Sequence, residues 1–120
     1  MAIIVENGSL VSGANSYVSA DDFITWADAR GVDYPSYPDI EKKIIRAMDY
    51  IETLSFIGQK HEETQPLQWP RDYVLIDGYS IESDEIPKEL KSAVYEAVKL
   101  DIDGDSKLAP SERETTSEQI

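Results

Sequence analysis

The sequence predicts a mainly α-helical protein, a small bundle of about three main helices with one short β-hairpin and extended N- and C-terminal arms. Three observations support this fold class. Apolar residues recur at helical spacing in three stretches, an Asp-Gly pair divides two short β-type runs, and polar segments lie at both ends. A chain of 120 residues corresponds to one domain. We expect a single helical domain over residues 1–104, with an arm at 1–18, and a polar tail at 105–120 that is mobile or docks on a partner.

The first helix is expected at about 20–30. The segment before it, residues 7–18, is rich in Gly, Ser and Asn and predicts an arm, with a short strand at 3–5. Ser19 followed by acidic residues is typical of a helix start, because its hydroxyl accepts from a free backbone amide. Gly31 is well suited to the position after the last turn.

The second helix is expected from about Asp39 to Leu54, with Gly58 as a stop. Prolines at positions 35 and 38 predict a loop over residues 32–38, since a proline disfavours helical geometry in the residue before it. The helix itself shows the strongest periodicity of the chain, formed by Ile40, Ile44, Ile45, Met48, Ile51 and Leu54.

A β-hairpin is expected at residues 74–81, followed by a third helix at 87–102. The central Asp77-Gly78 pair favours a type I′ turn, in which both residues have positive φ. Two strands alone are marginally stable, so the hairpin must pack on the helices. Pro87 is suited to the first position of the third helix.

The charge balance argues against tight binding to nucleic acid. Lys and Arg number 11 against 24 Asp and Glu, which gives a formal net charge of −13. A protein that neutralises phosphates needs a basic surface. The absence of cysteine excludes thiolate sites and cysteine nucleophiles, and His61 is the single histidine. We therefore expect no enzyme activity, no cofactor, no metal and no membrane segment.

The acidic residues near the end of the third helix resemble a calcium loop. Asp101, Asp103, Asp105 and Glu112 occupy loop positions 1, 3, 5 and 12. Ser106 stands where that loop requires glycine, so an acidic, solvated helix end is the favoured interpretation.

One group of basic and aromatic residues has the composition of a single-strand site. Sites for single-stranded nucleic acid combine cations with stacking aromatics. The alternative is an ordinary solvated helix face, which the charge pattern favours. The group comprises Lys42, Lys43, Arg46 and Lys60, with Tyr50 and Trp69.

The run Trp69-Pro70-Arg71 has two interpretations. Trp69 fills the core of a small domain, which is favoured, or Trp69 and Arg71 form an interface hot spot.

Several motifs resemble a family of tailed-phage proteins over about residues 5–100. They are Val5–Ser9, Gly13–Ser19, Gln65–Arg71, Asp77-Gly78, Ile81, Asp84–Pro87, Leu90-Lys91 and Ala93. Members are labelled DnaT-like single-stranded-DNA-binding proteins and also resemble head–tail connector, or head completion, proteins. One departure is Leu10, where the resemblance leads us to expect glycine.

The resemblance implies two alternative functions. The acidic balance favours a structural virion protein, a connector or adaptor that forms a ring of twelve copies under the portal. Its partners would be the portal protein, neighbouring copies and tail or second adaptor proteins, and packaged DNA would pass through without tight binding. The alternative is a DnaT-like single-stranded DNA-binding protein. The candidate interface residues are Asn15, Tyr17, Tyr34, Tyr37, Lys42, Lys43, Arg46, Trp69, Arg71, Pro110, Arg113 and Ile120.

Overall fold

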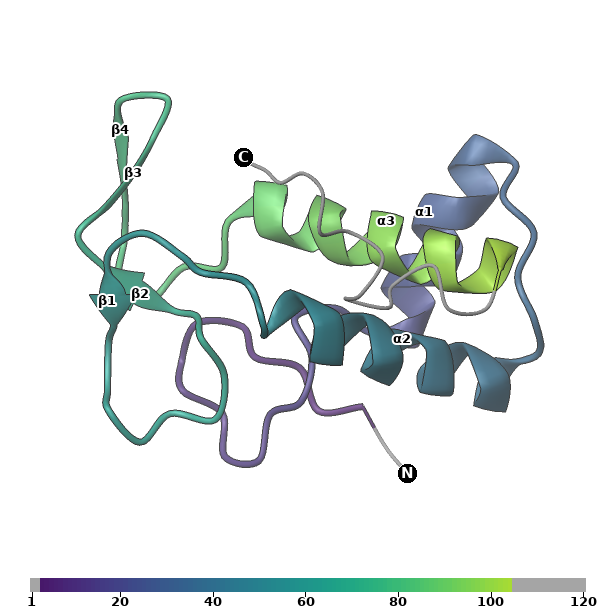
Figure 1. The fold of residues 1–120 in the computed structure, drawn as a ribbon, viewed down its shortest axis with the longest axis horizontal. Coiled ribbons are helices and arrows are strands. Elements are labelled where there is room, and N and C mark those ends of the chain that lie inside the picture. The colour runs from purple at the N-terminus through teal and green to yellow at the C-terminus, as the bar shows by residue number, and fades with distance from the viewer. Residues whose placement is uncertain (1–2, 105–120) are drawn as a thin grey trace.

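Within residues 3–104 three helices form the body of the fold, and two small antiparallel sheets lie at one end of it (Figure 1). The computed structural model describes residues 3–104, so the tail at 105–120 lies outside the described residues. The helices are α1 (Ala20–Arg30), α2 (Tyr37–Ile51) and α3 (Lys88–Asp103). The strands are β1 (Gln59–Lys60), β2 (Arg71–Asp72), β3 (Val74–Ile76) and β4 (Tyr79–Ile81). The predicted helical class with a short hairpin is confirmed.

Helix α1 has the predicted bounds because both of its ends are capped. The Ser19 hydroxyl accepts a hydrogen bond from the Asp22 amide at 3.0 Å. At the other end Gly31 adopts a left-handed conformation, with φ 68°, and its amide bonds to the last carbonyls of the helix.

Helix α2 begins and ends earlier than the periodicity predicts. It starts at Tyr37, which places Pro38 in the first turn. Backbone amides of the first turn have no carbonyl partner within the helix, so the amide hydrogen that proline lacks costs no hydrogen bond there. It ends at Ile51, and the Thr53 hydroxyl donates to the Tyr50 carbonyl at 2.6 Å. Leu54 is therefore 39% exposed outside the helix.

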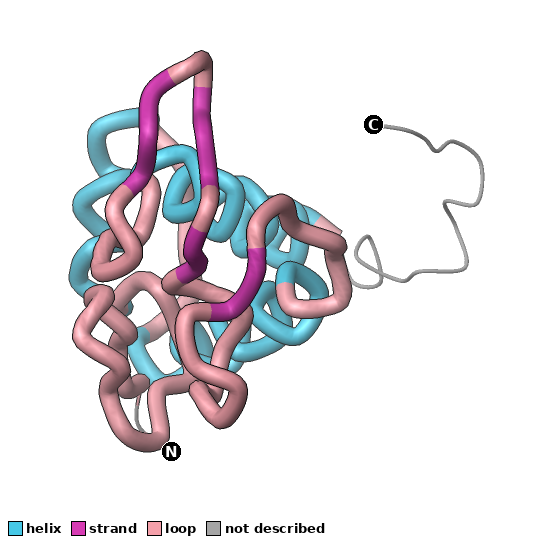
Figure 2. Tube along the Cα trace, turned by 90° about the vertical axis from the view of Figure 1, so that its left-hand side faces the viewer, coloured by secondary structure: helices cyan, strands magenta, loops and turns pink. Residues whose placement is uncertain are grey.

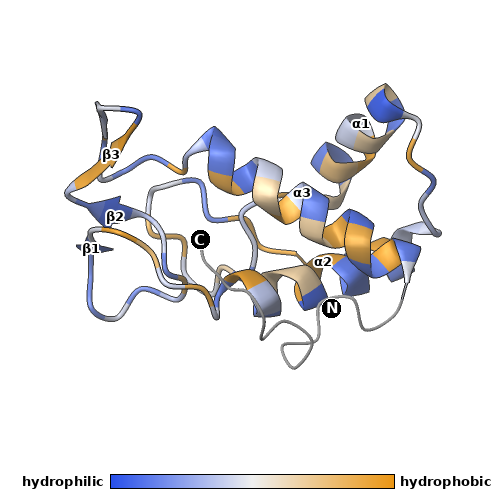
Figure 3. Ribbon diagram, turned by 45° about the horizontal axis from the view of Figure 1, so that its top comes forward, coloured by the Kyte–Doolittle hydropathy of each residue, from blue (hydrophilic) through white to orange (hydrophobic). Residues whose placement is uncertain are grey.

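The core lies mainly between α2 and α3, which run side by side in Figure 1. Figure 3 shows apolar residues on these helices and along β3. Helix α3 begins at Lys88, one residue later than predicted, because Pro87 is its N-cap. The fully or nearly buried apolar side chains of the two helices are Ile40, Ile44, Ala47, Met48, Ile51, Leu90, Val94, Ala97 and Val98. No helix in the described residues is both long enough and apolar enough to cross a bilayer.

The β3–β4 hairpin has the predicted turn and projects from the body (Figure 2). Asp77 and Gly78 have φ of 54° and 84°, as a type I′ turn requires. At the base of the hairpin Val74 is 2% exposed, and Ile76 and Ile81 pack on the core.

The sheet formed by β1 and β2 is not among the elements expected from the sequence. Gln59 pairs with Asp72 and Lys60 pairs with Arg71. Strands of two residues carry no alternation of apolar and polar positions, so their pairing leaves no local signal.

The N-terminal segment folds back on the body instead of extending as an arm. The expected strand at 3–5 is reduced to a single bridge between Val5 and Ser16. The Glu6 side chain is buried and accepts backbone hydrogen bonds from Gly8, Leu10 and Val11 at 2.8–2.9 Å. These bonds close a turn in which Leu10 adopts φ 63°, a conformation that suits the glycine expected there.

Candidate nucleic-acid interface

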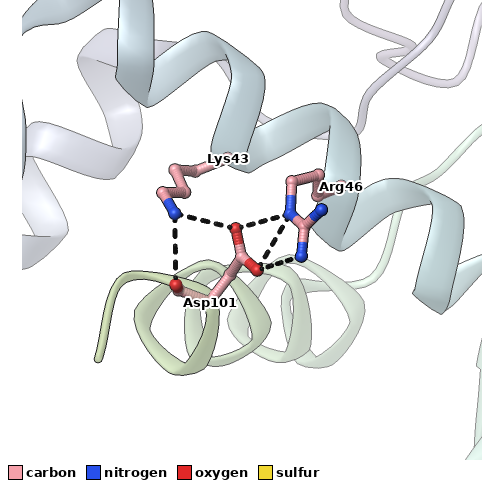
Figure 4. Close-up of polar contacts among 3 residues, drawn as sticks. All are labelled: Lys43, Arg46 and Asp101. Atoms are coloured by element: carbon pink, nitrogen blue, oxygen red, sulfur yellow. Dashed lines mark hydrogen bonds and ion pairs between the residues drawn. The ribbon is translucent and has the colours of Figure 1, made fainter. Parts of the chain in front are cut away.

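Two of the three cations predicted as a basic surface on α2 bind a buried carboxylate on α3 (Figure 4). The Asp101 side chain has no exposed surface. Arg46 Nε donates to both Asp101 carboxylate oxygens at 3.0 and 2.9 Å, and Arg46 Nη2 lies 2.9 Å from Oδ1. Lys43 Nζ lies 3.4 Å from Oδ2 and donates to the Asp101 carbonyl at 3.3 Å. Lys43 and Arg46 therefore hold the two helices together.

The other members of the predicted basic and aromatic group lie in different settings. Lys42 is exposed and lies 3.9 Å from Asp39. Lys60 belongs to β1, Tyr50 packs partly buried against the core, and Trp69 is 4% exposed. Because Trp69 is buried, it cannot stack on a base, and the group does not form one surface.

Trp69 and Arg71 belong to the interior, which is the favoured interpretation of their motif. A cis peptide bond joins Trp69 to Pro70, and the Trp69 ring meets the Phe56 ring edge to face. Arg71 is 7% exposed, and its guanidinium donates to Ile57 O at 2.7 Å, Gln68 Oε1 at 2.9 Å and Gly58 O at 3.1 Å. The alternative interpretation, an interface hot spot formed by Trp69 and Arg71, requires exposed side chains, and the chain closes around both of them.

Tyr17 joins the N-terminal segment to the rest of the molecule. The Tyr17 hydroxyl is buried, donates to Glu52 Oε2 at 2.5 Å and accepts from the Trp69 amide at 3.1 Å. Glu52 Oε1 accepts from the Gln68 amide at 2.9 Å. Burial and then the adjacent Glu52 carboxylate raise the pKa of Tyr17 above its ordinary value. Tyr17 is thus a structural residue in this fold.

The remaining candidate residues lie at the surface or outside the described residues. Asn15 Oδ1 accepts from the Ile4 amide at 2.8 Å. Tyr34 and Tyr37 are 36% and 48% exposed, and their hydroxyls donate to Asp28 and Asp21. These contacts leave the interface role of Asn15, Tyr34 and Tyr37 a prediction. Pro110, Arg113 and Ile120 lie outside the described residues.

The calcium-like acidic residues do not converge within the described chain. Asp101 binds the α2 cations, and Asp103 Oδ2 lies 3.5 Å from Lys99 Nζ. Asp105 and Glu112 fall outside the described residues. Within residues 3–104 no group of His, Asp and Glu is arranged to hold a metal ion.

A groove of about 430 Å³ separates the β3–β4 hairpin from the start of α3. We call it the hairpin groove. Its apolar wall comprises Ile76, Ile81, Ile86 and Pro87. Tyr79, which pairs with Ile76 across the hairpin, lines the same groove and is 76% exposed. An exposed aromatic ring beside an apolar wall is suited to stacking against a planar ligand.

Charged side chains of both signs line the hairpin groove. Lys88 pairs with Glu89 at 3.2 Å. A backbone hydrogen bond of Glu89, and then the bond from Lys88, lower the pKa of Glu89. Lys91 makes no ion pair within residues 3–104. Asp77 and Glu85 complete the charged lining. The groove therefore offers one aromatic face, cationic donors and carboxylate acceptors.

Reasoning from the sequence missed this groove because it assigned the hairpin only a structural role. One signal was present in the sequence: Tyr73 precedes the first strand of the hairpin and Tyr79 begins the second. Tyr73 is 83% exposed and adopts φ 64°, which turns the chain between β2 and β3.

Comparison with protein families gives one result that bears on function. The model of a family described as "Putative DnaT-like ssDNA binding protein" matches residues 1–120. Searches of curated proteins and of solved structures found no significant match.

The family match overturns the preference for a head–tail connector. A family described by single-stranded DNA binding supports the alternative function, so the expected ring under a portal, its adaptor role and its portal and tail partners are wrong. The expectation that DNA is not tightly bound is wrong for the same reason. The net charge favoured the connector wrongly, because it describes the whole protein surface, whereas DNA binding depends on the groups at one site. Since the match covers all 120 residues, the chain belongs to the family of putative DnaT-like ssDNA binding proteins.

Proposed function

We propose that this protein binds single-stranded DNA and acts by binding, without catalysis. The observation that carries the proposal is the family match over the whole chain. The hairpin groove supports it, because this groove combines an exposed tyrosine with two lysines on one face of the described structure. Stacking aromatics and nearby cations are the two components of single-strand sites.

Tyr79 is the proposed stacking residue. Its ring is 76% exposed, and Ile76 and Ile81 on the same hairpin flank it in the groove. A base within a duplex has both faces covered by its neighbours, so it cannot stack on this ring. An unpaired base can, and the proposed site therefore selects single strands over duplex.

Lys88 and Lys91 are the proposed phosphate contacts. They lie at the start of α3, and Lys91 has no ion-pair partner within residues 3–104. The net charge of −13 opposes the approach of DNA, so stacking supplies most of the affinity.

The test is fluorescence anisotropy with a labelled, mixed-sequence single strand of about 20 nucleotides. We expect saturable binding, weaker binding to the matching duplex, and a loss of about tenfold in affinity for Tyr79→Ala. Tyr73→Ala is the matched control, because Tyr73 is 83% exposed and does not line the hairpin groove. We expect this control to bind like the parent protein.

Two results would contradict the proposal. Absence of saturable binding to any single strand would remove single-stranded DNA as the ligand. Equal binding by Tyr79→Ala and the parent protein would remove the hairpin groove as the site. Far-ultraviolet circular dichroism of each variant checks that the fold is retained.

A further inference from the structure

We infer that the hairpin groove prefers bases that carry an exocyclic amino group, such as cytosine, over bases that present a carbonyl at the same position. The inference rests on the proposed function and adds to it a class of base. It depends on the carboxylates of the groove, which the binding of phosphates does not explain.

The carboxylates at the two sides of the groove are available as acceptors. Asp77 lies in the hairpin turn, two residues before Tyr79, and its side chain makes no hydrogen bond or ion pair within residues 3–104. Glu85 precedes α3, and its Oε1 receives one long bond from the Glu82 amide at 3.4 Å. An ionised carboxylate accepts hydrogen bonds and cannot donate one. These two groups therefore attract base edges that donate.

Cytosine and uracil differ at the position that such acceptors distinguish. Cytosine presents an amino group at carbon 4, and a carboxylate accepts from it. Uracil and thymine present a carbonyl oxygen there, which a carboxylate repels. Stacking on Tyr79 does not separate the two pyrimidines, because both have a π-face of similar size.

The cations of the groove do not reverse this preference. Glu89 already engages Lys88 at 3.2 Å, which reduces the tendency of Lys88 to donate to a base carbonyl. Both Lys88 and Lys91 are directed to phosphates, which are stronger acceptors than base carbonyls. The groove thus divides its tasks: Tyr79 stacks, the two lysines contact the backbone, and the carboxylates read the base edge.

The experiment compares oligodeoxycytidine with oligodeoxyuridine of about 12 nucleotides, by anisotropy at about pH 7.5. We expect the full chain to bind the cytidine strand about tenfold more tightly. The double variant Asp77→Asn with Glu85→Gln keeps the side-chain shapes and supplies amide donors. It should bring the two affinities to within about twofold. Asparagine also suits the positive φ at position 77.

A second double variant, Asp33→Asn with Glu63→Gln, is the matched control. Both residues are exposed and do not line the hairpin groove, and the change in net charge is identical. We expect it to keep the cytidine preference. Loss of the preference here as well would assign the effect to overall charge and overturn the inference.

The outcomes separate this inference from the proposed function. Equal binding of both strands by the parent chain overturns the base preference and leaves single-strand binding intact. Failure of both strands to bind overturns the proposed function. A preference that survives Asp77→Asn with Glu85→Gln shows that other groups read the base and overturns the inference. Sedimentation that shows Tyr79-dependent self-association without binding to either strand assigns the hairpin to a contact between copies and overturns both proposals.

Discussion

Arg46 on α2 holds the fully buried carboxylate of Asp101 on α3, 55 residues further along the chain, through Nε and Nη2. This contact corrects two interpretations of the sequence together. A basic α2 surface requires Arg46 to be available to a ligand, and a calcium loop requires Asp101 to be available to a metal. The fold joins the two side chains, so each is neutralised by the other.

Asp101→Asn should lower the free energy of unfolding by about 1–3 kcal/mol. The substitution keeps the shape of the side chain and removes the charge that neutralises Arg46 and Lys43. The Arg46 side chain is 54% exposed, so water solvates part of its charge when Asp101 is replaced. The expected loss of stability is therefore smaller than for a wholly buried ion pair. Urea unfolding followed by circular dichroism measures the change.

Asp103→Asn on the same helix is the matched control. Asp103 and Lys99 form a surface pair at 3.5 Å with side chains 44% and 39% exposed, and its loss should change the stability by less than about 0.5 kcal/mol. Equal effects of the two variants would mean that the Asp101 contact adds no more stability than a surface pair.

Tyr17→Phe should destabilise the protein by about 1–3 kcal/mol. The change removes a buried hydroxyl, so the buried Trp69 amide loses its acceptor and the half-buried Glu52 carboxylate loses a donor. Tyr73→Phe, at a side chain that is 83% exposed, is the control and should unfold at the parent midpoint. Thermal or urea unfolding that does not distinguish the two variants would contradict the structural role of Tyr17.

Gly8→Ala should destabilise the fold more than Gly31→Ala. At Gly8, where φ is 107°, an added Cβ would overlap the Asp84 carbonyl oxygen. At Gly31, where φ is 68°, the same atom meets nothing within 4 Å. We expect about 1 kcal/mol for the backbone conformation at Gly31 and more than about 3 kcal/mol at Gly8. Comparable urea midpoints for the two variants would argue against close packing of the N-terminal segment on Asp84.

The sequence predicts the elements whose causes are local. Ser19 and Gly31 cap α1 within one turn of its ends, and Asp77-Gly78 sets the hairpin through its own backbone preferences. The β1–β2 sheet and the contact between Arg46 and Asp101 depend on residues far apart in the sequence. No local pattern contains that information.

The candidate site was harder to predict than the fold, because the motifs that resemble the family are largely structural. Gly8 packs on Asp84, and Tyr17 bonds to Trp69, so these motifs meet one another inside the molecule. Tyr79, by contrast, has few neighbours to constrain it and lies outside those motifs. The motifs also include Asp77, Ile81, Glu85 and Lys91 of the hairpin groove, but they do not include its exposed aromatic ring.

His61 should stabilise the protein at low pH and contribute less at high pH. His61 Nδ1 lies 2.8 Å from Asp72 Oδ1, and this hydrogen bond raises the pKa of His61 above its ordinary value of 6.5. A raised pKa in the folded state means that the stabilising effect is fully present below pH 6.5. It is lost as the pH rises through the folded-state pKa.

The measurement for His61 compares the parent protein with His61→Gln. The difference in urea midpoint should be larger at about pH 5.5 than at about pH 8.5. NMR titration of His61 in Asp72→Asn should give a pKa closer to 6.5 than in the parent protein. An unchanged titration in Asp72→Asn would show that Asp72 does not control this histidine.

Binding to single-stranded DNA should depend weakly on salt. Each phosphate neutralised on a single strand contributes a slope of about −0.7 in a plot of log affinity against log salt concentration, so two lysines give about −1.4. Lys91→Ala should make the slope shallower by about 0.7, whereas Lys42→Ala on α2 should leave it unchanged. A parent slope steeper than about −4 would require more cationic contacts than the hairpin groove contains and would move the DNA path to another surface.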